Sequence, residues 1–185
     1  APNRPSRARA SPKAAAGGRF KLYHSARGQI LAQTDAAVTG ADGSIDLEVH
    51  GGTLPEAVAT RFKFIAAGVV LNVSRRDAER LSRTLVASQL VLVQENDAGL
   101  VQNATTAQLP GALDAMYGDA ARERDLGVRL RGASTHFKLW APTAQRVQLC
   151  LYDSGDGAAS GIETLRFDHH TGLWSGQRPK LDGRY

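Results

Sequence analysis

Cysteine and long apolar runs are both scarce in this 185-residue chain. The one cysteine, Cys150, has no partner for a disulfide within the chain. It stands in the alternating run 149–151, where we expect a small half-buried residue rather than a nucleophile, because no base is placed beside it. No apolar run approaches the roughly 20 residues that span a bilayer, so we expect no membrane-spanning helix.

Motifs for phosphate or acyl chemistry are also absent. No glycine-rich phosphate loop lies between a predicted strand and a predicted helix, and no G-x-S-x-G sequence occurs. Glycoside hydrolysis needs two carboxylates that face each other across about 5–10 Å. The acidic residues fall in turns and on exposed strand faces, where no pattern pairs them; examples are Asp42, Asp46, Glu48, Asp153 and Asp156. We therefore predict no catalytic residue in this chain.

A metal site is the other chemistry that the sequence raises. Asp168 precedes the adjacent pair His169 and His170 in the stretch DHHTG. Adjacent side chains on extended backbone point to opposite faces, so two neighbouring imidazoles seldom reach one ion. We interpret DHHTG as an exposed hairpin turn and predict neither a metal nor another cofactor.

Positive charge is concentrated at one end of the chain. Residues 1–19 carry five basic groups and no acid, while the remaining residues hold 18 of each sign. The segment is rich in Pro, Ala, Ser and Gly, and it has too little apolar surface to offset the entropy of ordering it. We expect a disordered basic leader or linker at 1–19, and neither nucleic acid nor a membrane as partner.

The rest of the sequence has the spacing of short strands separated by turns. We expect a hairpin in which 20–24 pairs with 29–33, a strand over 44–49, a helix capped by Ser74, and a hairpin around Gly99. A short helix over 110–121 would bury Leu113, Met116 and Tyr117. The charged stretch 122–127 then predicts a domain boundary, and the β-segments that follow it predict a β-sandwich.

The chain has eleven aromatic residues, of which only two are tryptophans. A sugar site on a sandwich usually needs exposed flat rings that stack on pyranose faces. Trp140 alternates with Leu139, so periodicity leaves open whether it faces solvent or a second layer. Trp174 lies just beyond the DHHTG turn, where it can pack under a neighbouring strand. Both are candidate carbohydrate-binding residues, and packing is the favoured interpretation for each.

The segment FKLWAPTAQRVQLCLYD, with the downstream stretches IETLRFD, HHTG and GLWSG, resembles a known module. This is the family-48 carbohydrate-binding module, which precedes the catalytic barrel of starch and glycogen debranching enzymes in glycoside hydrolase family 13. The upstream stretches RFKLYHSARGQI, SQLVLVQENDAG and LPGALDAMY resemble the small domain that lies before this module in type I pullulanases and limit dextrinases.

The resemblance implies a mainly β fold with short helices. Residues 20–126 would form a small, β-rich α/β domain, and residues 127–185 an immunoglobulin-like β-sandwich that lacks its last strand. The family's three catalytic acids lie on a (β/α)8 barrel, and no position here inherits them. Calcium occurs in some relatives, but no ligands can be named in this chain. Resemblance to bacterial pullulanases also favours an extracellular or periplasmic location.

The resemblance thus predicts a noncatalytic N-terminal fragment of an enzyme that hydrolyses α-1,6-glucosidic linkages. Its partners would be the catalytic barrel, which it would support, and, weakly, an α-glucan. Two alternatives remain open at this point. One is a stand-alone α-glucan-binding module, and the other is a cell-surface adhesion sandwich with no role in sugar binding.

Overall fold

The computed structural model describes residues 18–51, 55–61, 63, 69–78, 83–179 and 181. The chain divides into two compact units, Ala1–Gln108 and Leu109–Tyr185. Most of the predicted basic leader lies outside the described residues, and Arg19 begins the first strand. Among the described residues, no helix is long and apolar enough to cross a membrane.

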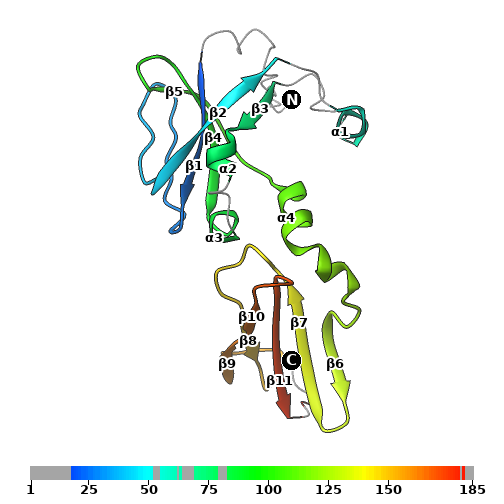
Figure 1. The fold of residues 1–185 in the computed structure, drawn as a ribbon. Helices are drawn as coiled ribbons and strands as arrows, with labels where there is room; N and C mark the ends of the chain where they lie inside the picture. Colours follow the sequence, from blue (N-terminus) through cyan, green and yellow to red (C-terminus); the bar gives the residue numbers. More distant parts are fainter. Residues whose placement is uncertain are drawn as a thin grey trace, which may run out of the picture. The chain divides into compact units, whose positions relative to one another are not determined.

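The first unit is built on a five-stranded antiparallel sheet with the order β3-β2-β1-β4-β5 (Figure 1). Its strands are β1 (Arg19–Ser25), β2 (Gly43–His50), β3 (Val70–Val73), β4 (Gln89–Glu95) and β5 (Val101–Thr106). The predicted strand over 44–49 is confirmed as β2, where Ile45 is buried and the residues beside it are not. The predicted hairpin around Gly99 is also confirmed as β4–β5, and Gly99 has the positive φ of 77° that this turn requires.

In the part of this unit that the structure describes there are three short helices: α1 (Glu56–Arg61), α2 (Arg75–Ala78) and α3 (Arg83–Val86). The predicted cap at Ser74 is confirmed, because its Oγ accepts a hydrogen bond from the Asp77 amide at 3.1 Å. Residues 79–82, which the sequence places in the same helix, lie outside the described residues.

The predicted pairing of 20–24 with 29–33 is wrong. Strand β1 pairs instead with β2 and β4, and residue Leu31 forms only an isolated bridge with Thr39. The physical reason is tertiary: Ile30 is buried against Val91 and Val93 of β4, in a core that β5 also lines. The segment therefore covers the sheet as a loop rather than extending it as a strand.

A buried carboxylate, that of Glu95, lies at the end of strand β4 in this sheet. The Glu95 side chain is 2% exposed. It accepts a hydrogen bond from the Tyr23 hydroxyl and forms an ion pair with Lys21, whose Nζ lies 3.0 Å from Glu95 Oε2. Burial, together with the hydrogen bond to Glu95, raises the pKa of Tyr23 from 10.0 to about 12. Tyr23 and Lys21 thus compensate the negative charge of Glu95, which would otherwise be costly to bury.

This cluster predicts a loss of stability in strong base. Folding favours the neutral phenol of Tyr23, so its contribution is complete below about pH 10, the pKa in an unfolded chain, and is lost as pH rises through the folded value near 12. We expect Tyr23→Phe to remove the last phase of the ultraviolet absorbance titration and to flatten the fall in stability above pH 10. A titration that Tyr23→Phe leaves unchanged would contradict this assignment.

The described residues of the second unit form two short helices and two antiparallel sheets. The helices are α4 (Pro110–Tyr117) and the 3₁₀ helix η2 (Gly118–Arg122). One sheet has the order β10-β11-β7-β6, and the other pairs β8 with β9 (Figure 1). These strands are β6 (Gly127–Arg131), β7 (Ser134–Trp140), β8 (Gln148–Leu151), β9 (Gly161–Thr164), β10 (Arg166–Asp168) and β11 (Leu173–Pro179). The mainly β fold class is confirmed.

Helix α4 lies in the second compact unit, which begins at Leu109, and the domain boundary expected at 122–127 stays a prediction. Tyr117 is 2% exposed and packs on Gly172, in the turn between β10 and β11. A Cβ built on Gly172 would lie 3.0 Å from Tyr117 Cδ1 and 2.7 Å from Pro142 Cβ. This close approach explains why the helix stays with the sandwich sheet that follows it.

Two other features of the second unit can be compared with the sequence. Strands β10 and β11 pair across DHHTG, which confirms the predicted hairpin turn. Cys150 is exposed, so the expectation of a half-buried residue is wrong. Its strand β8 belongs to the two-stranded sheet, which leaves the Cys150 face uncovered within the described residues.

Candidate functional site

The two tryptophans lie on opposite faces of the four-stranded sheet. In the antiparallel pairing of β7 and β11, Trp140 stands opposite Leu173, and Trp174 stands opposite Leu139. Directly paired residues share a face, and successive residues alternate between faces. The two rings therefore do not form one platform, and each has to be considered by itself.

Trp174 is a packing residue. It is 5% exposed, and its ring lies 4.8 Å from the ring of Phe167 on β10, at an interplanar angle of 38°. Its Nε1 donates a hydrogen bond to the Ala141 carbonyl at 2.9 Å. A buried indole whose one donor is satisfied has no free surface for a sugar.

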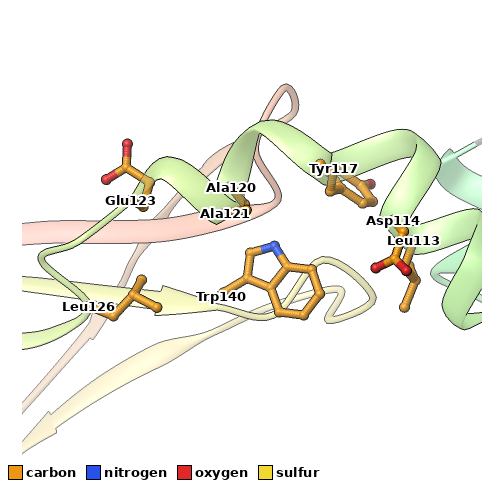
Figure 2. Close-up of a pocket in the computed structure, with 9 residues that line it drawn as sticks. Leu113, Asp114, Tyr117, Ala120, Ala121, Glu123, Leu126 and Trp140 are labelled. Atoms are coloured by element: carbon orange, nitrogen blue, oxygen red, sulfur yellow. The ribbon is translucent and has the colours of Figure 1, made fainter.

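Trp140 is 40% exposed and lines a pocket of about 340 Å³. Figure 2 shows its indole with Leu126 and Glu123 toward one end and Leu113 and Asp114 toward the other. The remaining lining comes from Tyr117, Gly118, Ala120 and Ala121 on α4 and η2. Small and apolar side chains thus surround one flat, accessible ring.

Two carboxylates supply the polar groups of this pocket. Asp114 is exposed on α4, while Glu123 follows η2 and its Oε2 lies 2.7 Å from Lys138 Nζ. Carboxylates accept hydrogen bonds from hydroxyl groups, and a flat indole stacks on the C–H face of a pyranose ring. The pocket therefore has the chemistry to hold one face of a neutral sugar. It shows no group activated as a nucleophile.

The turn between β10 and β11 contacts Trp140, because its Thr171 carbonyl accepts a hydrogen bond from Trp140 Nε1. Asp168 Oδ1 accepts from the His170 amide at 2.9 Å, and Oδ2 accepts from Thr171 Oγ1 at 2.6 Å. These bonds, with that from Thr171 the strongest, hold the pKa of the Asp168 carboxyl below its ordinary value of 3.8. Asp168 is therefore ionised at neutral pH.

The adjacent histidines of this turn have different neighbours. The ring of His169 lies edge-on to Phe167, with ring centroids 4.9 Å apart, whereas His170 Nε2 lies 2.9 Å from Asp119 Oδ2. In the part of the chain that the structure describes, no group of three His, Cys, Asp or Glu side chains is placed to hold a metal ion.

The sequence pointed to Trp140, but it did not identify the residues around it. Leu113 and Asp114 precede Trp140 by more than 25 positions, and the helix over 110–121 was interpreted only as a core element. The spacing of Leu113 and Tyr117 does indicate one helix face. Nothing in the local pattern shows that this face lies against Trp140.

Comparison with known families matches both units. The Pullulanase N2 domain family matches residues 8–115, which is more than half of the chain. The chain belongs to the Pullulanase N2 domain family. Carbohydrate-binding module 48, described as the isoamylase N-terminal domain, matches residues 125–185. Helix α4 lies at the end of the N2 match, and the four-stranded sheet of β6, β7, β10 and β11, which contains Trp140, lies within the module-48 match.

The relatives of this N2-family chain are pullulanases. The chain is 30% identical to Pullulanase 1, chloroplastic, from Arabidopsis thaliana over 83% of its own length, and 27% identical to pullulanase from Klebsiella pneumoniae over 85%. The crystal structure of apo pullulanase from Klebsiella pneumoniae matches 89% of the chain, with a TM-score of 0.65 and 26% identity. A structure of the Klebsiella pneumoniae enzyme complexed with maltotriose matches 87%, with a TM-score of 0.62.

This N2-family chain spans only about 15% of the length of those curated relatives. What it shares with them is the N2 domain and the module-48 domain. The predicted resemblance is therefore confirmed, because the chain matches pullulanases over the part that holds these two domains.

Proposed function

We propose that this chain is the noncatalytic N-terminal portion of a pullulanase-type debranching enzyme and that it makes a weak contact with α-glucan at the Trp140 pocket. The longer protein would hydrolyse α-1,6-glucosidic linkages, with its catalytic acids on the (β/α)8 barrel that the family resemblance implies. No cofactor is part of this proposal, and any calcium would belong to the rest of the longer protein.

The observation that carries the glucan contact is the exposure of Trp140 above an apolar pocket with two carboxylates at its ends. An indole with 40% of its surface free is unusual for a residue that only packs, because tryptophan gains most from full burial. The single ring explains why we expect weak binding, since one stacked residue gives little affinity by itself.

The relatives support the same class of ligand. Module 48 is by its description a carbohydrate-binding module, and one of the similar solved structures is a pullulanase in complex with maltotriose. Maltotriose is an α-glucan fragment, and a chain of this kind presents the flat C–H faces that stack on an indole. This likeness favours α-glucan over other neutral sugars as the ligand of Trp140.

The opposite face of the sheet supports a scaffold role. Val128, Leu130 and Leu139 are exposed by 61%, 57% and 49%. Val128 pairs with Phe137 and Leu139 pairs with Trp174, so these side chains share the face that holds the Trp174 core. Exposed aliphatic side chains gathered on one face are typical of a protein–protein contact. We propose that the catalytic barrel of the longer protein covers them.

Isothermal titration of the intact chain with maltoheptaose tests the glucan contact. We expect Trp140→Ala to weaken binding by about tenfold or more, by analogy with the loss of about 1–3 kcal/mol when an aromatic ring that stacks on a nucleobase is replaced by alanine. Trp140→Phe should keep part of the affinity. The matched control is Leu139→Ala, which removes an equally exposed apolar side chain from the other face of the same strand.

Three results would contradict the proposal. One is equal affinity in the unaltered chain and in Trp140→Ala, and another is an equal loss of affinity in Leu139→Ala. The third is release of reducing ends from pullulan by the pure chain, which would place catalysis here rather than in the rest of the longer protein. A complete absence of glucan binding would leave the scaffold role alone.

A further inference from the structure

The five-residue turn 168–172 is joined to both walls of the Trp140 pocket. Inside the turn, Asp168 is the organising residue, because one oxygen accepts from the His170 amide and the other from the Thr171 hydroxyl. The Gly172 amide also donates to the Asp168 carbonyl at 2.8 Å. Three hydrogen bonds therefore fix where the peptide groups of the turn point.

One of those peptide groups holds the tryptophan ring. Trp140 Nε1 donates to the Thr171 carbonyl at 3.1 Å, and the Ala141 amide donates to the Gly172 carbonyl at 3.3 Å. An indole has a single donor, so this bond selects one orientation of the ring among those its torsions allow. The exposed face of Trp140 is thus directed by the turn as well as by its own strand.

The helical wall of the pocket is tied to the same turn. His170 Nε2 lies 2.9 Å from Asp119 Oδ2 on η2, and Tyr117 at the end of α4 packs on Gly172. The distance between the ring and the helical wall therefore depends on a turn that contributes no side chain to the lining of the pocket.

We propose that Asp168 is a positioning residue for glucan binding: it holds the segment whose Thr171 carbonyl orients Trp140, and it holds the backbone of His170, whose side chain contacts Asp119 on η2. Asp168 touches no glucan in this account. The inference rests on the proposed function, because it concerns affinity at the Trp140 pocket. Its physical content is preorganisation, in which a ring fixed before binding loses less freedom when the sugar stacks on it.

The test compares Asp168→Ala and Asp168→Asn with the unaltered intact chain, by titration with maltoheptaose and by the indole Nε1–H signals in ¹⁵N-correlated NMR spectra. The chain has two tryptophans, so two such signals are expected. Asp168→Ala should shift the Trp140 signal and leave in place the Trp174 signal, whose donor bonds to Ala141. We expect affinity to fall by roughly three- to tenfold, the effect of freeing one side chain.

Two further variants keep the result interpretable. Asp168→Asn retains an oxygen that can accept one of the two bonds, so its affinity should lie between those of Asp168→Ala and the unaltered chain. Asp156→Ala removes an exposed acid from another loop of the same unit, and it should change neither readout. If Asp168→Ala fails to fold, Thr171→Val removes only the hydroxyl that Asp168 accepts from and should show the same shift with a smaller loss.

The outcomes separate this inference from the proposed function. Unchanged affinity in Asp168→Ala, beside lost binding in Trp140→Ala, overturns the positioning role alone. An unmoved Trp140 signal in Asp168→Ala overturns it as well. No binding of maltoheptaose by the unaltered chain overturns the glucan contact and this inference together.

Discussion

Trp174→Ala is expected to destabilise the second unit by about 3–5 kcal/mol, the usual loss when a buried tryptophan is truncated. The Trp174 side chain is 5% exposed and packs against the ring of Phe167, and its Nε1 donates a hydrogen bond to the Ala141 carbonyl. Truncation leaves a cavity beside Phe167 and removes one of the two hydrogen bonds that the Ala141 carbonyl accepts, the other coming from the Ala144 amide. A loss of this size is comparable to the whole stability of a unit this small, so we expect the unit to be largely unfolded.

Urea unfolding followed by tryptophan fluorescence measures this effect, because both tryptophans lie in the second unit and report on it alone. Trp140 remains as the reporter in Trp174→Ala. The matched control is Trp140→Ala, which should lower the midpoint far less because its ring is 40% exposed. Equal losses in the two variants would contradict the division into one packing and one displayed tryptophan.

Gly40→Ala is expected to destabilise the first unit by about 2–4 kcal/mol. Gly40 has φ of 73°, and a Cβ at this position would lie 1.9 Å from the Gln29 carbonyl oxygen. The contact is with backbone, so it cannot be relieved by a change of side-chain rotamer. Relief requires the loop to move, and the adjoining Ile30 is part of the core with Val91 and Val93.

Gly28→Ala is the matched control, because it separates the two causes. Gly28 lies in the same loop with φ of 68°, but nothing approaches its Cβ position within 4 Å. It should lose only the roughly 1–2 kcal/mol of a left-handed alanine. Native-state hydrogen exchange of β4 amides gives the stability of the first unit in each variant. If the two variants lose similar stability, the positive φ of Gly40, rather than its close contact with Gln29, is the reason that this position needs glycine.

The sequence predicted most reliably where one local pattern decides the structure. Alternation in 44–49 gives β2, and Gly99 gives the turn of the β4–β5 hairpin. The prediction for 29–33 is wrong because the apolar residues of this segment are compatible both with a strand and with a loop. Only the packing of Ile30 on β4 makes the segment a loop. Local propensity for strands is weak against such tertiary contacts.

The candidate site shows the same limit. Trp140 is identified from its motif, but the wall beside it, formed by α4 and η2, comes 18 or more residues earlier in the sequence. The alternation of Leu139 and Trp140 leaves open whether Trp140 faces solvent or a second layer, and in the structure both side chains are partly exposed. The reason is that the two faces of this sheet are each covered only in part: one by α4 and η2, the other by the residues around Trp174.

The most direct test of the central claim is a maltoheptaose titration followed by the two indole Nε1–H signals of the intact chain. The Trp140 signal is expected to shift progressively and saturably while the Trp174 signal stays in place. Movement of the Trp174 signal alone, or of neither signal at saturating maltoheptaose, would contradict a glucan contact at the Trp140 pocket.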